Sequence, residues 1–236
     1  MTFSFKRVYA IFQKDLKDLT KNIFVGTTLL IPVLLAVLYV KFGEQSIEIH
    51  FLVINLTFTT VAAFIQCTLI AEEKEKNTLR SLMLSPATTF EILGGKSLLS
   101  FIFTIVTVFI CALITGYESK NIFIISLAIF ISSLFYLELG TLLGLLTKSV
   151  MEASVVILPV MFLFGFGTMF QVLIEKYSQL SFLEYLPNIQ LLELAKSVES
   201  GVGLLDVWIK FAVISGWVVA GGILVVIVYK NRAMDD

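Results

Sequence analysis

The chain has 236 residues and a formal net charge of −1, with 58% hydrophobic and only 15% charged residues and a mean hydropathy of +0.95. Soluble domains contain about 45–50% apolar and about 25% charged residues, so this composition is typical of a membrane protein. The lack of a basic excess argues against a nucleic-acid-binding protein, which carries clustered positive charge. Cys67 and Cys111 lie in apolar stretches and are interpreted as small buried hydrophobic residues.

Six apolar stretches are long enough to cross a bilayer, which requires about 20 residues. They are residues 22–40, 49–71, 97–116, 122–147, 153–174 and 207–229. The sequence therefore predicts an all-α membrane protein in which residues 1–236 form one domain with six transmembrane helices.

The positions of lysine and arginine predict the orientation, because the cytoplasmic flanks of membrane helices retain positive charge. With the amino terminus inside, twelve of these residues lie on the cytoplasmic side and five on the outer side. We therefore expect a multi-pass protein of the plasma membrane with both termini in the cytoplasm.

Residues 1–21 precede the first span and contain apolar side chains at helical spacing between lysines. The apolar positions are Phe5, Val8, Tyr9, Phe12, Leu16 and Leu19. This pattern predicts an interfacial helix on the inner leaflet. The alternative is a helix that packs on the bundle without contacting lipid.

Residues 175–206 separate the last two spans and are too polar to cross the membrane but too apolar for a free loop. We expect two short amphipathic helices at the outer surface, broken at Pro187-Asn188.

The cytoplasmic segment 72–96 is the largest polar stretch predicted on the inner side. Asn77 or Thr78 can cap a short helix, which Ser85-Pro86 would end because the residue before a proline disfavours the helical region. Thr88 and Glu91 have the spacing of a capping box, so a second helix is expected to begin there and to continue into the third span.

Gly95-Lys96-Ser97 has the residue types that end a phosphate-binding loop, but its surroundings do not fit one. Such a loop has another glycine five residues earlier and lies between a strand and a helix, whereas this chain has Phe90 there and a predicted helix. We expect no ATP binding by this chain. The glycines are interpreted as a point of close helix approach, with Lys96 extending to the lipid headgroups.

Three stretches on the inner side resemble the signature of type-2 ATP-binding-cassette (ABC) export permeases. They are residues 72–79 (EEKEKNTL), 82–86 (LMLSP) and 91–96 (EILGGK). The six predicted spans, the basic amino-terminal helix and the paired outer helices agree with this resemblance. Two departures are Asn77, where the family usually has glycine, and Pro187-Asn188, where it usually has Asn-Pro.

The resemblance implies that two permease chains, expected to be identical, form the pathway and that two separate ABC ATPase subunits bind beneath them. ATP and Mg would be bound by the ATPase, with no cofactor, metal or catalytic site on this chain. Residues 78–85 would form a coupling helix that inserts into a groove of the ATPase. The predicted coupling residues are Glu72, Glu73, Glu75, Thr78, Leu79, Arg80, Leu82, Met83, Ser85 and Pro86.

A few polar residues within the spans are candidates for the translocation pathway. Glu138 lies in the fourth span, where an ionised carboxylate is costly, and a protonated or hydrogen-bonded carboxylate is the alternative. Gln66 and Asn55, eleven residues apart on the second span, could line the same pathway, although interhelical hydrogen bonds are the simpler role for each. Gly140 and Gly144 predict close packing of the fourth span.

The predicted function is ATP-driven export of a drug, an antimicrobial peptide or a lipid-like amphiphile. Haem, sodium or polysaccharide transport by the same kind of permease is an alternative. A secondary transporter or channel would leave the signature in residues 72–96 unexplained, and a membrane enzyme would need clustered His, Asp or Ser residues that this sequence lacks.

Overall fold

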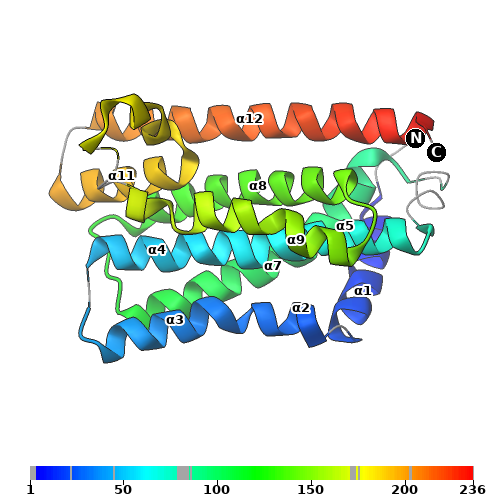
Figure 1. Ribbon diagram of the computed structural model, residues 1–236, viewed down its shortest axis with the longest axis horizontal. Helices are drawn as coiled ribbons and strands as arrows, with labels where there is room; N and C mark the ends of the chain where they lie inside the picture. Colours follow the sequence, from blue (N-terminus) through cyan, green and yellow to red (C-terminus); the bar gives the residue numbers. More distant parts are fainter. Residues whose placement is uncertain are drawn as a thin grey trace.

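The computed structural model describes residues 4–21, 23–44, 46–78, 85, 87–170, 174, 176–201 and 204–235. Within these ranges the chain is helical and contains no strand, so the all-α class is confirmed. The longer helices run side by side along the long axis of the molecule, and both chain termini lie at the same end of the bundle (Figure 1).

The helices follow the predicted apolar stretches closely. They are α1 (Phe5–Lys21), α2 (Ile23–Thr28), α3 (Leu30–Lys41), α4 (Ile47–Thr57), α5 (Phe64–Glu75), α7 (Thr89–Thr115), α8 (Ile122–Leu146), α9 (Val150–Val160), α11 (Pro187–Ser200) and α12 (Leu204–Asp235). Four irregular helical turns accompany them: η1 (Phe58–Ala63), η2 (Met161–Gly165), η3 (Gly167–Phe170) and η4 (Ser178–Tyr185).

Four helical stretches in the described residues are long and apolar enough to cross a membrane. They are Ile47–Glu75, Phe90–Thr115, Ile122–Leu146 and Leu205–Asn231. The first and fifth predicted spans correspond to shorter apolar helices, Gly26–Lys41 and Val150–Gly165. The second of these contains Pro159, which has no amide hydrogen to donate within the helix, and continues into the π-helical turn η2. The six-span topology therefore stays a prediction.

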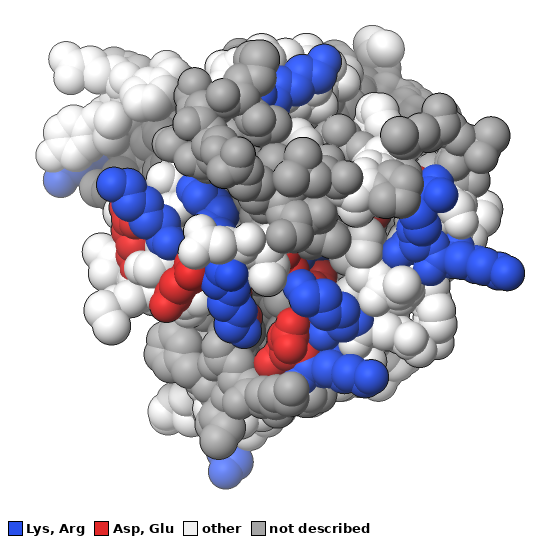
Figure 2. Space-filling model, turned by 90° about the vertical axis from the view of Figure 1, so that its right-hand side faces the viewer, with Lys and Arg blue, Asp and Glu red and all other residues white. Residues whose placement is uncertain are grey.

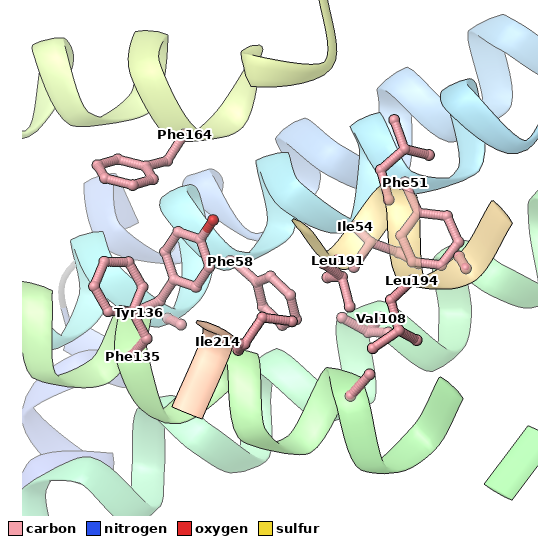
Figure 3. Close-up of a cluster of buried hydrophobic side chains, with 14 of the residues drawn as sticks. Phe51, Ile54, Phe58, Val108, Phe135, Tyr136, Phe164, Leu191, Leu194 and Ile214 are labelled. Atoms are coloured by element: carbon pink, nitrogen blue, oxygen red, sulfur yellow. The ribbon is translucent and has the colours of Figure 1, made fainter. Parts of the chain in front are cut away.

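The continuous helix formed by α4, η1 and α5 is the centre of the bundle and is buried along its spanning part. It packs against α7, α8 and α9, while α12 covers α8 (Figure 1). Aromatic residues fill much of the space beside it, and Figure 3 shows Phe58 and Tyr136 within this cluster. Their rings stack with centroids 5.0 Å apart. The central helix therefore also contacts α3 and α11, which come from the two ends of the sequence.

Two glycines on α8 permit close contact with this central helix. A Cβ atom on Gly140 would lie 2.3 Å from the carbonyl oxygen of Ala63, and one on Gly144 would lie 2.7 Å from that of Cys67. Neither distance is possible for a real side chain, so the backbones approach only because both positions lack one. The predicted close packing at Gly140 and Gly144 is confirmed.

The described part of the segment 175–206 contains the short helix η4 and the helix α11. Pro187 begins α11 rather than breaking a helix, because its fixed φ and missing donor suit the first helical position. Leu191, Leu192 and Leu194 are completely buried in the main hydrophobic cluster (Figure 3). The helix is amphipathic, because Glu193 and Lys196 stay partly exposed. Its location at the outer surface of the membrane stays a prediction.

The amino-terminal helix α1 lies across one end of the bundle and packs against α7 (Figure 1). Its buried face contains Ile11, Asp15 and Leu19, whereas Phe5 and Tyr9 are exposed. The exposure of Phe5 and Tyr9 is compatible with the predicted contact with lipid, and the interfacial location of α1 stays a prediction. The face that packs on the bundle also contains a charged residue, Asp15, which apolar spacing did not indicate.

Candidate functional site

The end of the bundle that carries both termini contains a dense group of charged side chains (Figure 2). α5 ends there at Glu75, and Asn77 follows with a φ angle of 55°. This left-handed conformation is one that asparagine adopts more readily than most residues. Asn77, a departure from the glycine usual in the resembled family, thus has a backbone conformation that glycine also adopts readily.

Lys96 is the centre of a buried ion network that joins three helices. Its Nζ lies 3.0 Å from Oε1 of Glu73 on α5 and 3.4 Å from Oδ2 of Asp15 on α1. Lys14, also on α1, forms a second ion pair with Glu73. All of Asp15, Glu73 and Lys96 are buried, with at most 3% of each residue exposed.

The four charges of this network balance, since Lys14 and Lys96 face Asp15 and Glu73. Buried charges are tolerated in proteins when they are paired in this way. Burial raises the pKa of the Asp15 carboxyl above its ordinary value, and the positive charge of Lys96 opposes that rise. The network therefore depends on Lys96.

A second contact ties α1 to the start of α7. The Arg7 guanidinium binds Glu91 with two hydrogen bonds, from Nη2 to Oε1 at 2.7 Å and from Nε to Oε2 at 3.1 Å. The backbone N–H of Thr88 donates to Glu91 Oε2 at 2.7 Å, and the Thr88 hydroxyl accepts from the N–H of Glu91. The predicted capping box is confirmed, and Glu91 also holds Arg7.

The two ion contacts lie on either side of the segment 79–84, which is outside the described residues. On one side, Thr78 Oγ1 donates to Glu73 Oε2 at 2.9 Å. On the other side, Thr88 caps α7 together with Glu91. Because Glu73 and Glu91 each pair with α1, this one helix holds both borders of the segment.

The predicted coupling residues divide into two groups. Five of them lie outside the described residues: Leu79, Arg80, Leu82, Met83 and Pro86. Among the others, Glu72 pairs with Lys76, Glu75 accepts a hydrogen bond from the N–H of Val150 at 2.9 Å, and the Ser85 hydroxyl accepts one from Ala87 at 3.3 Å.

Glu73 and Thr78 complete the second group, and Glu73 faces the inside of the fold. Only 4% of the Glu73 side chain is exposed, and both of its ion-pair partners belong to this chain. The interpretation of Glu73 as a recognition charge for another protein therefore does not fit its position. It positions α1 and α7 instead.

Sequence reasoning missed several residues of this site. Lys74 donates to the carbonyl oxygens of Leu145, at 2.6 Å, and of Thr147, so it joins the end of α5 to the end of α8. Cations commonly satisfy the free carbonyls at a helix end in this way. Arg7 and Asp15 were missed as well. The burial of Asp15 could have been suspected, because Asp15 lies between Ile11 and Leu19 on one stripe of the helix.

Gly95-Lys96-Ser97 lies within α7 and does not form a loop. A Cβ atom on Gly95 would lie 3.0 Å from Cβ of Ile11 on α1, so the expected close helix approach is confirmed at this glycine. The expectation that Lys96 extends to the headgroups was wrong. Its side chain is fully buried because Asp15 and Glu73 offer it two carboxylates inside the fold.

Gln66, a predicted pathway residue, is fully buried and links three helices. Its Nε2 donates to Thr141 Oγ1 on α8 at 2.9 Å and to Ser97 Oγ on α7 at 3.3 Å, and its Oε1 accepts from Ser100 Oγ at 2.9 Å. Gln66 therefore makes interhelical hydrogen bonds, the simpler of the two roles considered for it from the sequence.

Asn55 is also fully buried and contacts a different part of the fold. Its Nδ2 donates to the carbonyl oxygen of Asn188 on α11 at 3.3 Å. Asn188 in turn donates to the carbonyl oxygens of Leu163 and Phe164 at 3.1 Å. Asn55 and Gln66 therefore bind different helices, with the π-helical turn η1 between them.

Glu138 lies on α8 beside Gly221 and Gly222 of α12. The hydrogen bonds of Gln66 and Asn55 go to other residues, so these contacts do not bring the three candidate pathway residues together. Across the residues that the structure describes, no three His, Cys, Asp or Glu side chains are grouped to hold a metal ion. The charged side chains at the end of the bundle with both termini instead connect α1, α5, α7 and α8 to one another.

A protein-family model described as "ABC-2 family transporter protein" matches residues 48–228 of the chain. A search of curated proteins returned no match. The matched range begins in α4 and ends in α12, so it contains most of the bundle and both borders of the segment 79–84.

Proposed function

The chain belongs to the ABC-2 family of transporter proteins, and from this we propose that it is the permease subunit of an ATP-driven exporter. In this proposal two copies of the chain form the translocation pathway in the plasma membrane. Two separate ABC ATPase subunits bind and hydrolyse ATP with Mg. The chain itself is a transport component and carries no catalytic residue.

The observation that carries the proposal is the attachment of both borders of segment 79–84 to α1. A helix that receives force from a moving ATPase must be connected firmly to the spans. Thr78 and Thr88 connect the segment to α5 and α7, and the ion pairs of Glu73 with Lys14 and of Glu91 with Arg7 connect both to α1. Movement of the segment would thereby shift these helices together.

The proposed contact with the ATPase is a helix inserted into a groove, with Leu79, Leu82 and Met83 as its apolar anchors. Glu72 and Arg80 would lie at the rim and favour the correct partner by charge. Glu73 has no part in this recognition, because it is buried inside the chain. The cargo proposed for this permease is an amphiphile, in keeping with the apolar spans and the short connections between them.

Changing Leu82 and Met83 together to Asp should abolish assembly with the ATPase. Truncating buried interface anchors typically costs about 2 kcal/mol or more, and an unpaired buried charge adds to that cost. Arg80→Ala is the matched control in the same segment, since a rim charge mainly changes the association rate and its salt dependence. The measurement is co-purification of the ATPase encoded with the permease, followed by ATPase activity in lipid nanodiscs.

A double variant that retained its ATPase at wild-type stoichiometry, with cargo-stimulated activity, would show that residues 78–85 are not the coupling helix. Circular dichroism and the thermal unfolding midpoint of the variant must match those of the wild type. These two checks separate a lost interface from a misfolded chain.

The proposed orientation predicts which positions react with a membrane-impermeant thiol reagent in intact cells. In a background without Cys67 and Cys111, cysteine in place of Gln45 or Gln190 should be labelled, and cysteine in place of Lys76 should not. Permeabilised cells provide the control, because all three positions should then react. Labelling of position 76 alone in intact cells would invert the topology.

A further inference from the structure

Helix α8 packs against α12 (Figure 1). Glu138 on α8 lies at this contact, beside Gly221 and Gly222 of α12. A Cβ atom on Gly221 would lie 2.7 Å from Glu138 Oε2, and one on Gly222 would lie 3.2 Å from Oε1. The carboxylate therefore occupies space that exists only because both positions on α12 lack a side chain. This arrangement holds the carboxylate beside the backbone of α12.

The carboxylate has no ion pair in the described part of the chain, and its buried Oε2 atom has no hydrogen-bond partner. Glu73 and Glu91, by contrast, are buried and are both paired with cations. An unpaired carboxylate in the hydrocarbon region is costly and by default marks a functional position. The interaction that would offset this cost is absent from the described residues.

Glu138 is the polar residue of an otherwise apolar groove of about 460 Å³ that is open along α12. Its remaining lining residues are Val218, Val219, Gly222, Ile223, Val226 and Ile227. Val219 and Ile223 are more than half exposed, so the groove faces the outside of the chain within the spanning part of α12. Its size is that of a small-molecule site.

We propose that this groove binds a hydrophobic organic cation, with Glu138 as its counter-ion. The valine and isoleucine side chains would bury the apolar body, and the carboxylate would neutralise the charge. As a site for the cargo, this inference rests on the proposed export function, whereas the binding itself requires only this chain.

A second copy of the chain fits the groove less well than a cation does. A two-fold interface brings the same patch of both subunits together. An interface made by this groove would therefore bury two unpaired carboxylates among apolar side chains, which is costly. A ligand that brings a positive charge is the complementary occupant.

The test uses the purified chain alone in nanodiscs of zwitterionic phosphatidylcholine, with radiolabelled tetraphenylphosphonium as the probe. Saturable binding above that of empty nanodiscs is expected, and Glu138→Gln should weaken it by about tenfold or more. Glu44→Gln, which removes the same charge from an exposed position, should bind as the wild type does. Tetraphenylborate, of the same shape and opposite charge, should not compete.

A second variant tests the groove without touching the carboxylate. Ile223→Trp should fill the space and also weaken binding. Equal affinity of the wild type and Glu138→Gln, or equal competition by tetraphenylborate, would overturn the proposal. Because no ATPase is present in this assay, such a result leaves the proposed export function standing. Conversely, retention of the ATPase by the Leu82 and Met83 variant would contradict the proposed coupling but would leave cation binding standing.

Discussion

Lys96→Met is expected to lower the free energy of unfolding by about 3–5 kcal/mol, the range for removing one partner of a buried ion pair. Methionine keeps the length and much of the apolar surface of the side chain, so the change mainly removes the charge. Asp15 and Glu73 would then share a single cation, Lys14, inside the fold. The measurement is the unfolding of the purified chain in detergent micelles, followed by circular dichroism.

Two variants serve as controls for this prediction. Lys76→Met removes an ion pair with Glu72 in which the lysine side chain is 57% exposed, and such pairs contribute at most about 1 kcal/mol. Adding Asp15→Asn to Lys96→Met leaves one carboxylate and one ammonium, so part of the lost stability should return. Equal losses for Lys96→Met and Lys76→Met would contradict the buried network.

The effect of pH gives a further check on Lys96→Met. Burial already raises the pKa of Asp15, and removing Lys96 removes the charge that opposes this rise. The folded variant then binds a proton at a higher pH than the unfolded chain does, so its stability falls as the pH rises. The loss of unfolding free energy in Lys96→Met relative to the wild type should therefore be smaller at about pH 5 than at about pH 8.

Local features of the fold could be predicted from the sequence because short-range rules govern them. The capping box at Thr88 and Glu91 depends on two residues three positions apart, and the turn at Asn77 depends on the preference of one residue. Close packing at Gly140 and Gly144 follows from the spacing of small residues on one helix face.

The ion network could not be predicted in this way. Asp15 and Lys96 are 81 residues apart, and although Ile11 and Leu19 place Asp15 on an apolar stripe, nothing in the sequence identifies Lys96 as its partner. Apolar periodicity places hydrophobic residues on one side of a helix but gives no reason to put a charged residue there. Lysine was therefore expected at the membrane surface, although the fold supplies two carboxylates for Lys96 inside it.

The relation between Asn55 and Gln66 was missed for a different reason. Their spacing of eleven residues returns to one face only in a regular α-helix of about 3.6 residues per turn. The π-helical turn Phe58–Ala63 lies between them and has wider turns, so the phase of the helix changes. The two side chains therefore reach α11 in one case and α7 and α8 in the other.

Gly140→Ala should destabilise the chain by about 3 kcal/mol or more, at the upper end for overpacked cores, because the obstacle is backbone. Its added Cβ atom would lie 2.3 Å from the carbonyl oxygen of Ala63 and 2.9 Å from its Cα atom. A flexible side chain could move aside, but the backbone of the central helix cannot move without shifting α8. Unfolding in detergent micelles measures this loss.

Gly216→Ala is the matched control, since it makes the same change within α12 at a position with no atom within 4 Å of the new Cβ. There alanine should be neutral or more stable than glycine by up to about 1 kcal/mol, because it loses less backbone freedom on folding. If Gly140→Ala lowers the free energy of unfolding and Gly216→Ala raises it, the loss arises from the contact between α8 and the central helix. If Gly140→Ala were as stable as Gly216→Ala, the two backbones could not approach as closely as the structure places them.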